Sequence, residues 1–276
     1  MKPRAMKPLP RIAIPMPHST NREYGERAIP QYERAVALAG GEPVRIPLDG
    51  TSADVMKLIA GCDALLLPGS NADVDPTRFE QEPSPHTAAP DAQRERVDDA
   101  LLDDAYARRK PVLGICYGLQ SLNVYRKGSL IQHIPDFLPG ATRTKVNHEA
   151  GKKVAVAHSV KIHHNSTLAS IVNGANREGH GFSRADLGAT ENRAFAPEGS
   201  LIVPVNSSHH QSAAVIGEGL RIVARCPDDG IIEALEGTSP DQFVLAVQWH
   251  PERSVDDDEA SRAIFRALVE AARRPD

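Results

Sequence analysis

Cysteine is scarce in this sequence, and long apolar runs are absent. Its 276 residues include only three cysteines, Cys62, Cys116 and Cys226, a number that is both low and odd. A disulfide-rich scaffold is therefore disfavoured, and a reducing compartment, the cytoplasm, is expected. Because no stretch of 18 apolar residues occurs, the sequence predicts no transmembrane helix and no membrane partner. The apolar stretch 12–16 is too short, and too interrupted by proline, to be a signal peptide.

An excess of positive charge is also missing. Lys and Arg number 32, against 36 Asp and Glu, and this balance disfavours a nucleic-acid partner. Apolar residues, in contrast, are plentiful: hydrophobic residues make up 41% of the chain, enough to form a core and to exclude disorder throughout. Neither an internal repeat nor a linker is visible, so we predict a single domain over 1–276, with 1–10 flexible.

Strand and helix patterns alternate through the first half of the chain, which predicts an α/β fold: a mostly parallel central sheet with helices on both faces. Continuous apolar runs at 64–67 and 111–115 are typical of strands buried on both faces. Strand patterns dominate the second half, so additional strands are expected there. The expected strands are 11–16, 44–48, 64–67, 111–115, 153–163, 201–203, 220–224, 231–235 and 243–247, and the expected helices are 30–39, 52–60, 91–109, 119–125 and one that begins near Ser254.

A candidate nucleophile lies in the segment 114–118, which reads Gly-Ile-Cys-Tyr-Gly. A predicted buried strand precedes it and a predicted helix follows, the setting of a nucleophile elbow, where flanking glycines relieve crowding around a strained residue. The thiol of Cys116 would then lie at the carboxyl edge of the sheet, where the following helix favours the thiolate. The pentapeptide alone fits equally well a cysteine that is only a small buried hydrophobe.

His250 and Glu252 follow the strand predicted at 243–247, two residues apart. If the chain stays extended, both side chains lie on one face, because side chains alternate along a strand. A neutral imidazole can accept the proton of a thiol, and a carboxylate can orient the ring through its other nitrogen. With a cysteine elbow in the same chain, this pair favours a Cys-His-Glu catalytic triad over two unrelated surface residues.

A turn after the buried strand at 64–67 could supply an oxyanion hole. The residues 67–70 read Leu-Pro-Gly-Ser, and a glycine turn at this edge of the sheet can direct backbone N–H groups at a developing negative charge. The expected donors are the N–H groups of Ser70 and of Tyr117, the residue after the candidate nucleophile. An ordinary strand-to-loop turn remains the alternative, because Pro-Gly is common in turns.

Together these motifs resemble the class I glutamine amidotransferase family, and most of all its γ-glutamyl hydrolase branch, which includes γ-glutamyl-γ-aminobutyrate hydrolases. The resemblance covers most of the chain and rests on the motifs at 67–70, 73–76, 114–120, 206–211 and 248–252. It implies a flavodoxin-like sheet, a triad of Cys116, His250 and Glu252, and hydrolysis through a γ-glutamyl thioester. It also implies residues that bind the substrate, namely Gly69, Gln120, Ser208, His209 and His210.

The predicted function is therefore hydrolysis of a small γ-glutamyl compound, with a place in polyamine catabolism. No cofactor and no metal are expected, since neither His-Glu-x-x-His nor paired Cys-x-x-Cys spacing occurs. The histidine pairs 163–164 and 209–210 are adjacent, so strand alternation would point the two members of each pair to opposite faces. The small-molecule substrate is the one partner expected, and the sequence leaves a homodimer open.

Two alternatives to the hydrolase stay open. One is a glutaminase subunit that delivers ammonia to a separate synthase, although no synthase segment follows before Asp276. The other is a catalytically silent binding protein on the same fold. It is suggested by Arg-Lys-Gly at 126–128, where the branch usually has a glycine pair. Tyr117, where many members have arginine, is a departure on the leaving-group side. The polar segment 173–200 has no clear periodicity, and we expect a lid or an interface there.

Overall fold

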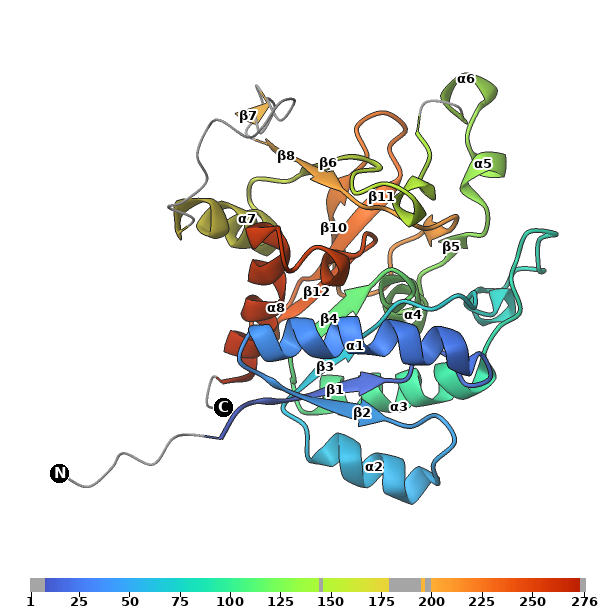
Figure 1. The fold of residues 1–276 in the computed structure, drawn as a ribbon. Coiled ribbons are helices and arrows are strands. Elements are labelled where there is room, and N and C mark those ends of the chain that lie inside the picture. The colour runs from blue at the N-terminus through green and yellow to red at the C-terminus, as the bar shows by residue number, and fades with distance from the viewer. Residues whose placement is uncertain (1–7, 144–145, 179–194, 197–199, 274–276) are drawn as a thin grey trace.

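The computed structural model describes residues 8–143, 146–178, 195–196 and 200–273. Ten strands form one sheet in the order β2-β1-β3-β4-β12-β11-β10-β6-β8-β7 (Figure 1). The first five in this order pair only in parallel, with the 2-1-3-4-5 arrangement of a flavodoxin-like sheet. This half of the sheet confirms the predicted fold class. Its strands are β1 (Arg11–Pro15), β2 (Glu42–Ile46), β3 (Ala64–Leu67), β4 (Val112–Ile115) and β12 (Val244–Val247).

The additional strands expected in the second half of the chain extend the same sheet beyond β12. Every neighbouring pair in this half is antiparallel. A separate two-stranded ribbon pairs β5 (Leu130–Ile131) with β9 (Ser212–Ala213). The antiparallel strands of the main sheet are β11 (Ile232–Gly237), β10 (Leu220–Arg225), β6 (His158–Ile162), β8 (Ser200–Val205) and β7 (Phe195–Ala196).

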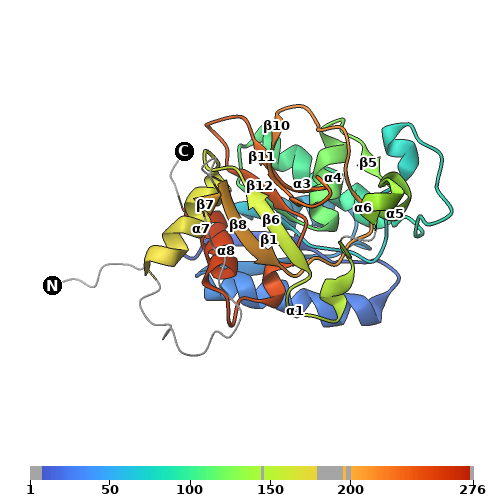
Figure 2. The ribbon, with the colours of Figure 1, turned by 90° about the horizontal axis from the view of Figure 1, so that it is seen from above.

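Helices cover both faces of the sheet, which lies between two helical layers when seen from above (Figure 2). One face packs against α1 (Arg22–Leu38), α7 (Thr167–Glu178) and α8 (Glu259–Ala272), and the other against α2 (Ser52–Ala60), α3 (Ala92–Ala107) and α4 (Tyr117–Tyr125). The remaining helical segments are short turns: η1 (Pro76–Phe79), α5 (Ile134–Phe137), α6 (Gly140–Arg143), η2 (Ala150–Lys152) and η3 (Pro251–Arg253).

The strand β3 shows why the parallel half has continuous apolar runs. Ala64 and Leu66 pack into the core under α1 and α8, whereas Leu65 and Leu67 pack into the core under α3 and α4. Alternation along the strand therefore divides its side chains between two cores, and both faces need apolar residues.

Several predicted boundaries are wrong. The strand expected at 153–163 begins only at His158, and Val154 and Val156 are exposed. The last helix begins at Glu259 because Asp258, not a residue near Ser254, accepts the capping hydrogen bond from the Ser261 N–H, at 2.8 Å. The helix expected at 30–39 is the second half of α1, which continues through a proline. Of the segment 173–200, residues 173–178 belong to α7, and most of the rest lies outside the described residues.

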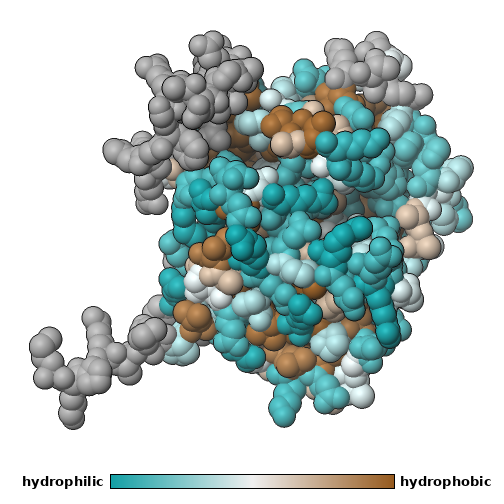
Figure 3. Space-filling model, in the orientation of Figure 1, coloured by the Kyte–Doolittle hydropathy of each residue, from teal (hydrophilic) through white to brown (hydrophobic). Residues whose placement is uncertain are grey.

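No described helix is both long and apolar enough to cross a membrane. The face of the molecule seen in Figure 3 is mostly hydrophilic, with hydrophobic residues in small groups.

Candidate active site

Cys116 occupies a strained turn between β4 and α4. Its φ of 53° and ψ of −106° lie outside the regions that a residue with a side chain prefers. A Cβ on Gly114 would lie 2.8 Å from the carbonyl oxygen of Gly118, and a Cβ on Gly118 would lie 2.2 Å from that of Leu67. Both positions therefore require glycine, and the strand–turn–helix context expected for a nucleophile elbow is present.

Three strand ends meet at this edge of the sheet, since β3, β4 and β12 run in parallel. Gly69 follows β3, Cys116 follows β4 and His250 follows β12. A Cβ on Gly69 would lie 3.2 Å from Cε1 of His250 and 3.7 Å from Cβ of Cys116. The imidazole and Cys116 thus both border a position that a larger residue would fill, and both line the same cavity.

Glu252 holds the other side of the His250 ring. Its Oε1 lies 2.7 Å from Nδ1 of His250, and both residues are buried. The expectation that the chain stays extended here is wrong, because Glu252 lies in the helical turn η3, which brings its carboxylate back to the ring. Asn206, after β8, binds the backbone of His250 twice: its Oδ1 accepts from the His250 N–H and its Nδ2 donates to the His250 carbonyl, each at 2.9 Å.

The electrostatics of this group favour an ion pair. Burial opposes the charged form of His250, but the Glu252 carboxylate and the sulfur of Cys116 outweigh it and raise the pKa of His250 to about 9. Burial likewise opposes the charged form of Glu252, but the charge of His250 lowers its pKa below the usual value. At neutral pH the ring can therefore hold a proton beside the Glu252 carboxylate.

The two amides predicted to form an oxyanion hole are both available. Within the described residues, the N–H groups of Ser70 and Tyr117 donate no hydrogen bond, whereas that of Gly69 donates to the hydroxyl of Tyr32 at 3.0 Å. Arg94 holds this turn from below, donating to the carbonyl of Pro68 at 2.8 Å. The Tyr117 ring lies against the guanidinium of Arg94, 4.9 Å from its centre, so this residue is directed into the core rather than toward a substrate.

A cavity of about 610 Å³ opens above the sulfur of Cys116. Of the residues expected to bind substrate, Gln120, Ser208, His209 and His210 line this cavity, and Gly69 lies just beside it. The Nε2 of His210 lies 3.1 Å from Asp73. The ring nitrogens of His209, however, lie near other groups, with Nδ1 2.9 Å from the carbonyl of Gln211 and Nε2 3.5 Å from Glu233.

Charged residues in the cavity wall were not expected from the sequence. Arg27 comes from α1, and Glu149 and Lys152 come from the segment around η2. Lys152 donates to Glu149 at 2.7 Å. Arg94, which holds the candidate oxyanion turn, was also missed, because a charged residue in a helix pattern normally indicates a solvated face. An acidic residue four positions later, Asp98, was the available signal for this buried pair.

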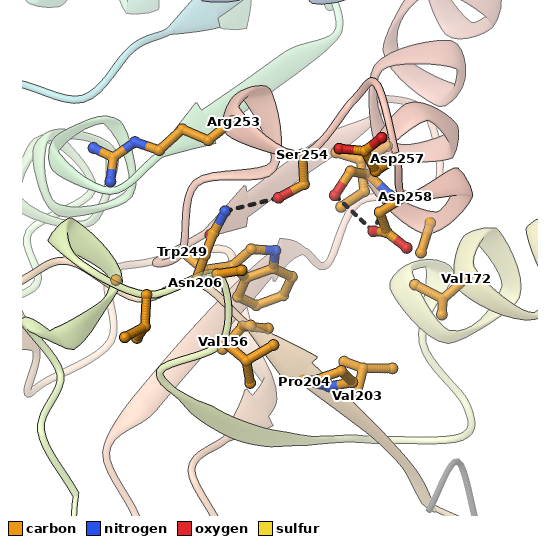
Figure 4. Close-up of a pocket in the computed structure, with 17 residues that line it drawn as sticks. Val156, Val172, Val203, Pro204, Asn206, Trp249, Arg253, Ser254, Asp257 and Asp258 are labelled. Carbon is orange, nitrogen blue, oxygen red and sulfur yellow. Dashed lines mark hydrogen bonds between the residues drawn. The ribbon is translucent and has the colours of Figure 1, made fainter. Parts of the chain in front are cut away.

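A second cavity, of about 380 Å³, lies between β8, the segment 249–258 and α8. Figure 4 shows Trp249 and Val203 in its wall and Asn206 donating to Ser254, at 2.9 Å. Its described lining includes none of the three residues Cys116, His250 and Glu252, but Arg253 borders both cavities.

Comparison with known proteins places this geometry in a family. The family model of peptidase C26 matches residues 12–252. The chain belongs to the peptidase C26 family. A glutamine amidotransferase-like protein of Rickettsia prowazekii is 31% identical over 252 residues, covering 88% of each chain. The γ-glutamyl-γ-aminobutyrate hydrolase of Escherichia coli K12 is 29% identical over 245 residues, covering 87% of this chain and 84% of that protein. The family and these names indicate a hydrolase of the peptidase C26 type, within the class I glutamine amidotransferase-like proteins.

Solved structures similar to this peptidase C26 member are glutamine amidotransferase domains. The glutaminase domain of Trypanosoma brucei CTPS, with bound acivicin, has a TM-score of 0.57 and 17% identity, over 97% of this chain and 95% of that one. A GMP synthase protein from Thermoplasma acidophilum has the same TM-score, 0.57, and 14% identity, over 97% of this chain and 96% of that one. At sequence identities this low, the structural similarity shows that the fold is shared and nothing further.

Proposed function

We propose that the protein hydrolyses the γ-amide bond of a small γ-glutamyl compound and releases glutamate. The observation that carries this proposal is the buried grouping of Cys116, His250 and Glu252 at the carboxyl edge of the sheet, with Glu252 hydrogen-bonded to the His250 ring. A thiol at a strained turn, a ring that can exchange a proton with it and a carboxylate that orients the ring are the parts of a cysteine hydrolase.

The reaction would begin with attack of the Cys116 thiolate on the γ-carbonyl carbon. The negative charge on the carbonyl oxygen would be stabilised by the N–H groups of Ser70 and Tyr117, at about 3 kcal/mol for each donor. The imidazolium of His250 would give its proton to the departing amine as the C–N bond breaks, which leaves a γ-glutamyl thioester. His250 would then take a proton from water, whose oxygen attacks the thioester. Cleavage of the C–S bond releases glutamate and restores the thiolate.

Charges of both signs in the cavity wall support a γ-glutamyl substrate. The α-amino and α-carboxylate groups of this substrate need an anionic and a cationic partner, respectively. Asp73 and Glu149 supply carboxylates, whereas Arg27 and Lys152 supply cations. The name of the E. coli relative supports γ-glutamyl-γ-aminobutyrate as the first compound to assay.

A panel of γ-glutamyl amines, with glutamine included, tests the proposal. We expect the wild-type protein to release glutamate from at least one γ-glutamyl amine, and the isosteric variant Cys116→Ser to lose this activity. Rapid quenching and intact-protein mass spectrometry should show one glutamyl group on the wild-type chain and none on Cys116→Ser. Turnover of glutamine alone, and only with a synthase added, would favour the glutaminase instead. Binding of γ-glutamyl compounds without turnover would indicate a silent binding protein.

A further inference from the structure

Four buried side chains converge at a place that the proposed reaction does not use. His148 precedes η2, His158 begins β6, His209 follows β8, and Glu233 lies in β11. None of them is more than 9% exposed, and Glu233 is completely buried. Together they join four separate segments of the antiparallel half of the molecule.

Three imidazole nitrogens surround one oxygen of this carboxylate. Nδ1 of His148, Nε2 of His158 and Nε2 of His209 lie 3.1, 3.4 and 3.5 Å from Oε1 of Glu233. All four ligand atoms lie within 4.8 Å of one another. Zinc bonds of 2.0–2.1 Å in a tetrahedron would place neighbouring ligand atoms about 3.3 Å apart, which agrees with the three nitrogen–oxygen separations.

The outer nitrogen of each ring fixes its tautomer. Nε2 of His148 lies 2.8 Å from the carboxylate of Asp229, Nδ1 of His158 lies 3.0 Å from the carbonyl of Ser159, and Nδ1 of His209 lies 2.9 Å from a carbonyl. Because these oxygens only accept, each outer nitrogen carries the hydrogen. In the neutral rings, the inner nitrogens therefore direct lone pairs at Glu233. Carboxylates and carbonyls hold metal-binding histidines in this way.

Without a cation, this arrangement is unfavourable. The three inner nitrogens and both oxygens of Glu233 have no hydrogen-bond partner among the described residues. Lone pairs would face a carboxylate in a site that water does not reach, and each buried polar group without a partner costs about 1–3 kcal/mol. The carboxylates of Glu233 and Asp229 together carry two negative charges, which one divalent cation balances.

We propose that His148, His158, His209 and Glu233 bind a zinc ion. Nitrogen ligands favour zinc over calcium or magnesium, which prefer oxygen. Four protein ligands close the coordination shell, so the role is structural rather than catalytic. His209 lies in the loop 206–211, whose first residue, Asn206, holds the backbone of His250. The ion thereby fixes the loop that supports the candidate catalytic histidine, and this assignment does not depend on the hydrolase function.

A buried proton is the rival explanation for the cluster. Burial opposes protonation of His148, but Asp229 and Glu233 outweigh it and raise the pKa of this histidine to about 9 in the metal-free cluster. A proton would satisfy one inner nitrogen and leave the other two facing the carboxylate, whereas a metal ion engages all four groups. The number of metal ions per chain distinguishes a bound zinc ion from a bound proton.

The test uses the full chain, produced without a metal-affinity tag in medium that contains zinc. Mass spectrometry of the metals should find one zinc ion per chain in the wild-type protein. Glu233→Gln and His158→Gln should bind zinc at least about 10-fold more weakly, since loss of a ligand exceeds the 10- to 100-fold effect of supporting residues. The matched control His164→Ala removes an exposed histidine outside the cluster and should keep its zinc. Cys116→Ser should also keep it, which separates this site from the proposed hydrolase chemistry.

A second measurement stands even if the cluster variants fail to fold. Chelator-treated wild-type protein is titrated with Co²⁺ alone, and the intense visible absorption of a tetrahedral site is expected. Zinc added back should raise the melting temperature by about 5 °C or more, since binding only to the folded state stabilises it. A protein that contains no zinc, takes up none and shows no cobalt spectrum would overturn the proposal. Equal zinc in Glu233→Gln and His164→Ala would overturn it too.

Discussion

At the scale of single residues, burial changes the chemistry of ordinary side chains. Exposed at a strand end, His250 would titrate like any surface histidine. Its surroundings differ because Glu252 lies 2.7 Å from its Nδ1 and both side chains are buried. Glu252 and Cys116 therefore determine the pH range over which the His250 ring holds its proton.

We expect an NMR titration of His250 to give a pKa of about 9 in the wild-type protein. Glu252→Gln should lower this pKa, because it removes the charge of the carboxylate, and Cys116→Ser should lower it as well, because a serine hydroxyl carries no charge. Turnover should likewise fall as the pH rises through about 9, where the leaving amine loses its proton donor. Glu270→Gln, an exposed change in α8, is the control. An unchanged pKa in Glu252→Gln would contradict the ion pair.

At the scale of elements, the elbow exists because α4 begins almost in contact with β3. Gly118→Ala would place a Cβ 2.2 Å from the carbonyl oxygen of Leu67. We expect a loss of about 3 kcal/mol or more in the free energy of unfolding, since neither backbone can yield. Gly174→Ala is the matched control: it lies inside α7 with no atom within 4 Å of the new Cβ. There alanine should stabilise the protein by about 0.5–1 kcal/mol. Denaturant unfolding measures both.

The helix α3 contributes a buried ion pair that holds the turn after β3. Arg94 is completely buried, and its Nε lies 2.7 Å from Asp98. Arg94→Met should lower the free energy of unfolding by about 3–5 kcal/mol, because it leaves the Asp98 carboxylate buried without its cation. Adding Asp98→Asn should recover part of this loss. Arg96→Met changes an exposed arginine in the same helix, and we expect a loss below about 1 kcal/mol. Equal losses for the two arginines would contradict this account.

At the scale of the whole molecule, the fold assigns different surroundings to the three cysteines. Cys62 packs under α2 and Cys226 packs in a small core beside α5. Burial raises the pKa of Cys62, and it raises that of Cys226 to about 12. Cys116 lines the cavity of about 610 Å³ beside His250. Of the three thiols, that of Cys116 therefore lines a cavity beside a histidine, whereas the other two are packed in apolar cores.

We expect iodoacetamide to modify the native protein once, at Cys116, and to abolish turnover. Cys116→Ser should take up no label under the same conditions, and the denatured wild-type chain should take up three, as its cysteine count requires. Peptide mass spectrometry identifies the site. Rapid labelling of Cys62 or Cys226 in the native protein would contradict their assignment as packing residues.

The sequence by itself determined the parallel half of the sheet and the segments that carry the candidate triad. Apolar runs such as 64–67 are local patterns, and the elbow glycines act on immediate neighbours, so both can be recognised without a structure. The helix starts were less accurate, because capping depends on which side chain reaches a free N–H group: the helix expected to begin near Ser254 begins at Glu259, after its N-cap Asp258. Alternation does not apply at 209–210, because β8 ends at Val205, although the two histidines have different partners. It failed at 163–164, whose rings stack because β6 ends at Ile162.

Only the tertiary structure decided which distant residues share a site. The cluster at His148, His158, His209 and Glu233 has no short spacing, because its members come from four segments that meet only when the antiparallel strands pair. The same is true of Arg94 under the turn at Pro68, and of Asn206 behind His250. A local sequence pattern reflects the burial and the backbone geometry of a single helix or strand. The convergence of buried charges depends on packing between elements, so it appears only in the folded molecule.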